Sequence, residues 1–164
     1  MPIKVLVVDD SALIRQILSE IVTRDPGLTL VGAAPDAYAA KRMVQEFRPD
    51  VITLDIEMPK VDGLRFLEVM MKAMPTPVVM ISTLTERGAD ATLRALELGA
   101  VDFMAKPKLG VAQGMAEYAA VIVEKIKAAA HSRLGQPTQT RCTKHASSMY
   151  NDPRNPYGAW EHLT

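Results

Sequence analysis

Short apolar runs rich in β-branched residues recur along this chain, and a segment with helical periodicity follows each of them. This alternation is typical of βαβ units, in which parallel strands are joined by crossover helices. The expected strands are Ile3–Val8, Leu28–Val31, Val51–Leu54, Val78–Ile81 and Val101–Ala105. We therefore predict an α/β fold built on a doubly wound, five-stranded parallel sheet.

Capping residues and helix breakers set the expected helix boundaries. Ser11 and Asp36 are suited to cap the first and second helices, and Asp62-Gly63 forms a turn before the third. The fourth helix is expected near Asp90 to Leu98. The residues expected to face the sheet are Ala39, Met43, Val44 and Phe47 in the second helix, and Leu64, Leu67, Met70 and Met71 in the third. Right-handed crossovers favour strand order 2-1-3-4-5, the flavodoxin-like arrangement.

The composition of the chain changes near residue 130. Five strands and five helices are complete by that point, so we expect one domain over residues 1–130. Residues 131–164 contain few aliphatic side chains and several prolines and polar residues. Such a segment buries too little apolar surface to fold alone, and we expect a disordered tail or linker remnant there.

The charge balance and the cysteine content limit the classes of protein to which this chain can belong. The chain has 19 basic and 19 acidic residues, and this balance gives no general affinity for nucleic acid or an acidic membrane surface. The single cysteine, Cys142, excludes an internal disulfide framework and fits a reducing compartment. No apolar run approaches the ~18 residues that span a bilayer, and no signal peptide precedes the first strand. We expect a cytoplasmic monomer.

Polar residues follow four of the expected strands. Asp9 and Asp10 follow the first, Asp55 the third, Ser82 the fourth and Lys106 the fifth. The carboxyl ends of parallel strands form the ligand-binding edge of such a sheet, so these side chains should meet there. Two carboxylates about 4 Å apart repel by roughly 4 kcal/mol at an effective dielectric near 20. Such a cluster therefore predicts a bound cation, and carboxylate ligands favour Mg²⁺.

This set of side chains is suited to phosphoryl transfer. Asp55 lies between the acid pair and Lys106, which makes it the best placed nucleophile for forming an acyl phosphate. Lys106 offers a positive charge to a phosphoryl oxygen, and Ser82 can donate a hydrogen bond to another. The metal ligands predicted from these residues are Asp9, Asp10 and Asp55.

Other functions compete with a reversible phosphoacceptor. A Mg²⁺ phosphohydrolase with an aspartyl nucleophile would use similar residues, although dehalogenase-like enzymes place Asp-x-Asp after the first strand and this chain has Asp9-Asp10 there. A flavodoxin-like FMN carrier needs a phosphate-binding loop, where this chain has acids. A third alternative is an interaction domain that keeps the fold and never accepts phosphate.

At these positions the sequence resembles the receiver domain of two-component response regulators over about residues 1–130. Asp9-Asp10 matches the acidic pair, Asp55 the phosphoacceptor, Ser82 the hydroxyl residue, Phe103 the switch aromatic and Lys106-Pro107 the lysine with its proline. The resemblance implies phosphorylation of Asp55 by a sensor histidine kinase with Mg²⁺, for which Glu57 supplies a backbone carbonyl. It also implies a cis bond between Lys106 and Pro107.

The sequence is most similar to the N-terminal receiver of the chemotaxis protein-glutamate methylesterase family. The motifs are Val-Val-Asp-Asp-Ser-Ala-Leu-Ile-Arg, Asp-Ile-Glu-Met-Pro and Val-Val-Met-Ile-Ser-Thr-Leu-Thr. In that family the receiver blocks a C-terminal esterase until it is phosphorylated. We find no counterpart of the esterase domain in this sequence, so we expect a switch domain without methylesterase activity. The expected output surface combines the fourth helix, the fifth strand and the last helix, where an esterase domain or another partner would bind.

Overall fold

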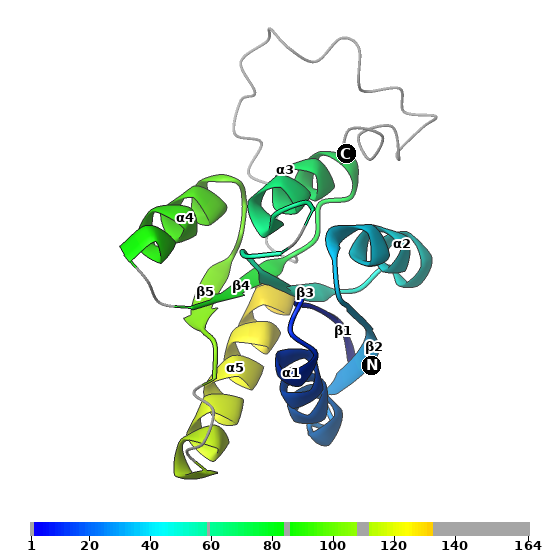
Figure 1. The fold of residues 1–164 in the computed structure, drawn as a ribbon. Helices are drawn as coiled ribbons and strands as arrows, with labels where there is room; N and C mark the ends of the chain where they lie inside the picture. The colour runs from blue at the N-terminus through cyan, green and yellow to red at the C-terminus, as the bar shows by residue number, and fades with distance from the viewer. Residues whose placement is uncertain (1, 59, 84–85, 108–111, 133–164) are drawn as a thin grey trace, which may run out of the picture.

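The five predicted strands form one parallel sheet. The computed structural model describes residues 2–58, 60–83, 86–107 and 112–132, so most of the expected tail, residues 131–164, lies outside the described residues. The strands are β1 (Ile3–Val8), β2 (Leu28–Ala34), β3 (Val51–Asp55), β4 (Val78–Ser82) and β5 (Asp102–Ala105). Their order is β2-β1-β3-β4-β5, which confirms the predicted topology (Figure 1).

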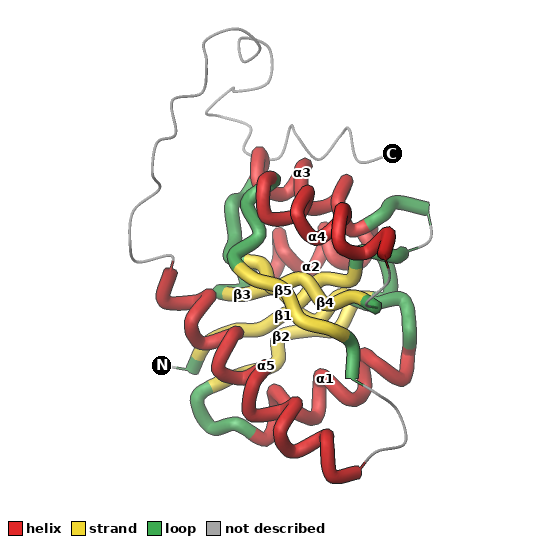
Figure 2. The backbone as a smooth tube through the Cα atoms, turned by 90° about the vertical axis from the view of Figure 1, so that its left-hand side faces the viewer, coloured by secondary structure: helices red, strands yellow, loops and turns green. Residues whose placement is uncertain are grey.

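Five helices cover the two faces of the sheet. They are α1 (Ala12–Arg24), α2 (Ala37–Phe47), α3 (Gly63–Ala73), α4 (Glu86–Glu97) and α5 (Ala112–Ser132). Helices α1 and α5 pack on one face, and α2, α3 and α4 pack on the other, so the molecule has three layers (Figure 2). No helix in the described ranges is long and apolar enough to cross a membrane.

The expected N-caps form because short polar side chains satisfy amide groups that the first helical turn leaves free. Ser11 accepts a hydrogen bond from the amide of Ile14 at 3.4 Å. Asp36 accepts one from the amide of Ala39 at 2.8 Å. Asp62 in turn accepts from an amide of the first turn of α3, also at 2.8 Å. These caps set where α1, α2 and α3 begin, close to the ends of the strands before them.

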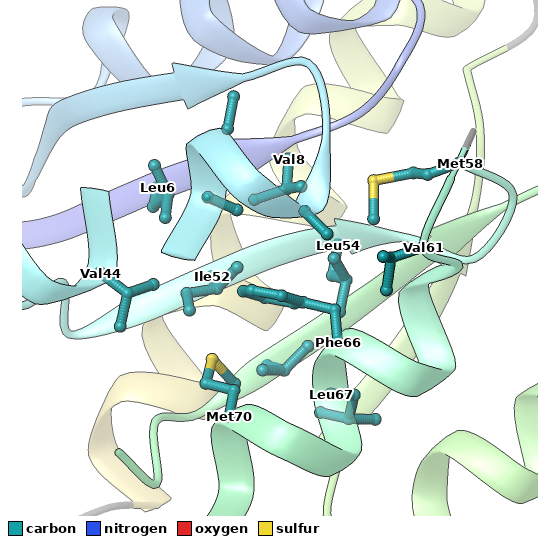
Figure 3. Packing of buried hydrophobic residues seen from close by; sticks show 14 of the residues in the cluster. Leu6, Val8, Val44, Ile52, Leu54, Met58, Val61, Phe66, Leu67 and Met70 are labelled. Atoms are coloured by element: carbon teal, nitrogen blue, oxygen red, sulfur yellow. The ribbon is translucent and has the colours of Figure 1, made fainter. Parts of the chain in front are cut away.

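Two apolar cores lie on the two faces of the sheet. The central strands are buried on both faces, which explains why their sequences are continuously apolar. Phe66 of α3 is fully buried beside Ile52 and Leu54 of β3 (Figure 3), although the helical pattern did not identify it as a core residue. Phe47 was expected to face the core, but it is the last residue of α2 and is 37% exposed.

Several boundaries differ from the predictions. Strand β2 continues to Ala34, and β5 begins at Asp102 instead of Val101. Helix α4 starts at Glu86, one turn earlier than expected, and α5 extends to Ser132. The added residues of β2, Gly32 to Ala34, pair with Leu6, Val7 and Val8 of β1. The division of the chain at residue 130 stays a prediction.

Candidate functional site

Three carboxylates meet at the carboxyl edge of the sheet. Asp9 and Asp10 directly follow β1, and Asp55 ends β3, which pairs with β1. One carboxylate oxygen from each residue lies within 4.8 Å of the others. Asp9 and Asp55 are each 1% exposed, whereas Asp10 is exposed to solvent. The structure therefore brings together the three acids that the sequence placed at one edge.

Backbone amides hold two of these carboxylates in place. The amide of Ser11 donates to Asp9 Oδ1 at 2.9 Å, and the amide of Glu57 donates to Asp55 Oδ1 at 3.2 Å. Each acid thus forms a hydrogen bond to the backbone two residues later, a turn that short acidic side chains favour. These hydrogen bonds orient both side chains.

Lys106 joins the acids from the end of β5. Its Nζ atom lies 3.0 Å from Asp55 Oδ2 and 3.3 Å from Asp9 Oδ2. The lysine side chain is 16% exposed. Its backbone amide donates to the carbonyl oxygen of Ser82 at 2.9 Å, which ties the end of β5 to the end of β4. One ammonium group therefore bridges two buried carboxylates from different strands.

Burial and mutual repulsion alter the protonation of this cluster. Burial, followed by the charge of Asp9, raises the pKa of Asp55 to about 7. Burial also raises the pKa of Asp9, although the Ser11 amide and Lys106 act in the opposite direction. Burial alone would lower the pKa of Lys106, but Asp55 and Asp9 together outweigh it and raise that pKa. Lys106 therefore stays charged at neutral pH.

The acidic cluster fits a hard divalent cation. Asp9 Oδ2 is buried and accepts no hydrogen bond from the residues that the structure describes; its neighbour is the Lys106 ammonium, 3.3 Å away as an ion pair. Three carboxylates beside one ammonium leave net negative charge, which a bound cation would offset. Oxygen ligands of this kind suit Mg²⁺, and Asp9, Asp10 and Asp55 are the side chains that could hold it. Glu57, given by the resemblance as a carbonyl ligand, lies two residues beyond Asp55.

The other residues predicted for the site, Ser82 and Phe103, differ in their exposure to solvent. Ser82 ends β4 at the same edge and is 8% exposed. Phe103 lies in the edge strand β5, is 41% exposed and is not part of the acidic cluster. The Lys106–Pro107 bond is trans, since no cis peptide bond occurs in the described part of the chain. This corrects the expectation from the resemblance, and trans is the favoured isomer of X–Pro bonds by about 0.5–1 kcal/mol.

The backbone of Gly63 packs closely against the backbone of Asp55. Gly63, the first residue of α3, donates its amide to the carbonyl oxygen of Ile56 at 2.9 Å. A Cβ atom at residue 63 would overlap the carbonyl oxygen of Asp55. Only glycine allows α3 to begin this close to the end of β3.

Two residues beside the site were not identified from the sequence. The Arg15 guanidinium donates to the carbonyl oxygens of Asp9 at 2.7 Å and Asp10 at 3.1 Å. The Tyr118 hydroxyl donates to the carbonyl oxygen of Ala105 at 2.8 Å. Arg15 lies one turn into the helix that follows the acid pair, and this spacing could have revealed it. Tyr118 had no such signal, because its partner is a backbone carbonyl in another element.

Comparison with protein families places most of the chain in one group. The family model described as the response regulator receiver domain matches residues 5–112. The chain is 64% identical over 134 residues to protein-glutamate methylesterase/protein-glutamine glutaminase 2 of Pseudomonas aeruginosa. That match covers 82% of this chain and 38% of the relative. A protein of the same name, numbered 1, from Xanthomonas campestris is 53% identical, with 93% of this chain and 42% of the relative covered.

Solved structures give the same picture. The response regulator domain of Thermotoga maritima CheB is 44% identical, with a TM-score of 0.72, and the match covers 80% of this chain and 98% of that one. The receiver domain of NtrX from Brucella abortus is 31% identical, with a TM-score of 0.62, and 74% and 96% of the two chains are covered. The chain thus spans a whole receiver domain and about two fifths of the length of the methylesterases.

Proposed function

Because this chain belongs to the family of response regulator receiver domains, we propose that it carries a phosphoryl group on Asp55 as a signalling switch. The observation that supports this proposal best is the position of Asp55. Its carboxylate is buried between the acids of β1 and the ammonium of Lys106, on the central strand β3. A nucleophile that already has a cation beside it is suited to accept a group whose oxygens carry negative charge.

The proposed step is an in-line displacement at phosphorus. A carboxylate oxygen of Asp55 forms a bond to the phosphorus atom of a phosphorylated histidine on a sensor kinase. The bond between phosphorus and the histidine nitrogen breaks, and that nitrogen keeps the electron pair. Lys106, 3.0 Å from Asp55 Oδ2, would then bind an oxygen of the transferred group. Ser82, at the end of the neighbouring strand, would donate a hydrogen bond to another.

Asp9, Asp10 and Asp55 would hold Mg²⁺ in this reaction, with the backbone carbonyl of Glu57 as a further ligand. The ion would supply positive charge to the phosphoryl oxygens and offset the repulsion among the acids. In this proposal the chain's own residues orient the nucleophile. The amide of Glu57 fixes the Asp55 carboxylate, and Lys106 fixes its other oxygen.

The output of the switch would pass through β5. Movement of Ser82 toward the phosphoryl group would make room beside β4, into which Phe103 could turn. Two charge-assisted hydrogen bonds to the phosphoryl group, at about 1.5–3 kcal/mol each, would be strong enough to shift the chain from mostly the inactive to mostly the active conformation. Exposed apolar side chains suited to a protein partner lie on α4 and β5 and directly before β5, namely Leu93, Leu96, Val101 and Phe103.

The relatives suggest the pathway. Since relatives reported above are named protein-glutamate methylesterases, we propose that this receiver acts in chemotaxis signalling and that an esterase domain is its output partner. The donor would be a sensor histidine kinase. We assign no esterase activity to the residues of this chain.

Replacing Asp55 tests the phosphoacceptor directly. Wild-type protein incubated with Mg²⁺ and a small phosphodonor such as acetyl phosphate should incorporate one phosphate per chain, read by intact-protein mass spectrometry. Asp55→Asn should show no incorporation, because its amide cannot form the acyl phosphate. Asp36→Asn, which changes only a helix cap on α2, is the matched control and should be labelled like wild type. Labelling of the Asp55 variant at the wild-type rate would reject the assignment.

The same experiment separates a receiver from a phosphohydrolase. A receiver takes up one phosphoryl group per chain and then turns over slowly. Continuous release of phosphate from generic phosphate esters such as p-nitrophenyl phosphate, abolished in Asp55→Asn, would support a hydrolase instead.

A further inference from the structure

Tyr118 of α5 contacts the backbone directly before Lys106. Its hydroxyl oxygen donates to the carbonyl oxygen of Ala105 at 2.8 Å, across 13 positions of sequence. Ala105 is the last residue of β5, so the contact joins helix α5 to the end of the edge strand. The tyrosine is partly buried, which shields this hydrogen bond from competing water.

The peptide unit between Ala105 and Lys106 is held at both of its polar groups. Its carbonyl oxygen accepts from Tyr118, and its amide, which belongs to Lys106, donates to the carbonyl oxygen of Ser82 at 2.9 Å. One bond comes from α5 and the other from β4. Both bonds resist rotation of this peptide plane, and they therefore restrict the direction in which the Lys106 side chain leaves the backbone.

The rest of α5 is docked without this hydroxyl group. Ile122, Ile126 and Ala129 are almost fully buried and pack in the core below the sheet. Tyr118 precedes Ile122 by four residues and therefore lies on the same helix face, one turn closer to the site. Loss of the hydroxyl alone should leave the helix in place and free only the Ala105 carbonyl.

We propose that Tyr118 is a positioning residue for phosphoryl transfer, which holds the Lys106 ammonium against Asp55 by fixing the Ala105–Lys106 peptide unit. The inference rests on the proposed phosphorylation of Asp55. It adds a mechanical link between α5 and the site, because a displacement of α5 would change the orientation of Lys106. This coupling is reciprocal. A change in the orientation of Lys106 on phosphorylation would therefore also shift the position of α5.

Tyr118→Phe in the full chain tests the proposal, since it keeps the ring and removes the hydroxyl. We expect the rate of phosphorylation by acetyl phosphate at saturating Mg²⁺ to fall about fivefold, as small misplacements of reacting groups do. The Mg²⁺ dissociation constant should not change, because the three acids are untouched. Tyr38→Phe is the matched control: its ring lies under Lys60 Nζ at 6.0 Å, far along the chain from α5, and its rate should equal that of wild type.

A double-mutant cycle with Lys106→Ala distinguishes positioning from general damage. If Tyr118 acts through Lys106, adding Tyr118→Phe to Lys106→Ala should cause no further loss of rate. The proposal is overturned by an unchanged rate in Tyr118→Phe, by an equal loss in the Lys106→Ala background, or by a parallel loss of Mg²⁺ affinity.

A measurement on wild-type protein covers the case in which Tyr118→Phe does not fold. The hydroxyl proton of Tyr118 should exchange slowly enough with water to be observed by NMR, and fast exchange would overturn the contact. The proposed function fails separately, because a wild-type chain that takes up no phosphate would refute it whatever Tyr118 does.

Discussion

At the scale of single residues, the buried carboxyl group of Asp55, the proposed phosphoacceptor, destabilises the folded chain. Its carboxyl is buried, and the raised pKa of about 7 means that its ionised form is unfavourable in the folded chain. One pKa unit corresponds to about 1.4 kcal/mol, so the ionised group costs at most about 4 kcal/mol above pH 7. Lys106 lowers the pKa of Asp55, and the value of about 7 already includes this stabilising contribution.

Asp55→Asn should therefore stabilise the protein when Mg²⁺ is chelated, by about 1–2 kcal/mol at pH 8. Because the folded-state pKa is raised, wild type recovers stability as pH falls through 7 toward 4, and the difference should shrink over that range. Urea unfolding in EDTA at pH 8 and pH 5 measures both values. A variant less stable than wild type at pH 8 would contradict the explanation.

Thr53 is a second residue whose hydroxyl works against stability. It is 1% exposed in the centre of β3, and its Oγ1 has no hydrogen-bond partner among the residues described. Thr53→Val keeps the shape and removes the unpaired group, so we expect about 1 kcal/mol of added stability in urea unfolding. Thr76→Val is the control: that hydroxyl donates to the carbonyl oxygen of Met74 at 2.9 Å, and its loss should destabilise. Equal effects of the two substitutions would contradict this.

Residue roles were predictable where the signal is local. Asp9, Asp10, Asp55 and Lys106 each follow an apolar run, and parallel strands bring such positions to one edge. The contact of Tyr118 with the Ala105 carbonyl depends on the rotation of α5, which periodicity alone does not give.

At the scale of elements, the start of α3 and the end of β3 form one unit. Gly63 touches the backbone of Asp55 so closely that a methyl group cannot fit. We expect Gly63→Ala to cost about 3 kcal/mol in urea unfolding and to slow phosphorylation, because the clash must displace Asp55. Gly27→Ala is the control, since the atoms nearest to its Cβ would belong to the side chains of Asp25 and Lys127 and not to the backbone. A Gly63 variant as stable as the Gly27 variant would refute the contact.

Element type was predictable, whereas packing detail was not. The caps at Ser11, Asp36 and Asp62 predicted three helix starts because capping is a local hydrogen bond. Phe66 was missed because a broad apolar face allows more than one stripe to fit, and only the position of the sheet decides which is buried.

At the scale of the whole molecule, the acidic edge should couple metal binding to stability. Mg²⁺ at one hundred times its dissociation constant should stabilise the fold by about 2.7 kcal/mol, which raises the melting temperature. Asp10→Asn should reduce this shift, and Glu20→Gln on the exposed side of α1 should not. The melting temperatures of wild type and both variants, measured with and without Mg²⁺, test this prediction. An unchanged shift in the Asp10 variant would exclude that carboxylate as a ligand.

The order of the sheet also determines which part of the molecule can move at low cost. Among the strands that the structure describes, β5 pairs with β4 on one side only, while β3, which bears Asp55, is held by ladders on both sides. In the proposed switch, β5 can therefore shift while the ladders that join β1, β3 and β4 stay intact. The phosphorylation proposed for Asp55 would then remain on a firmly held strand, and the response would pass through the strand that is easiest to displace.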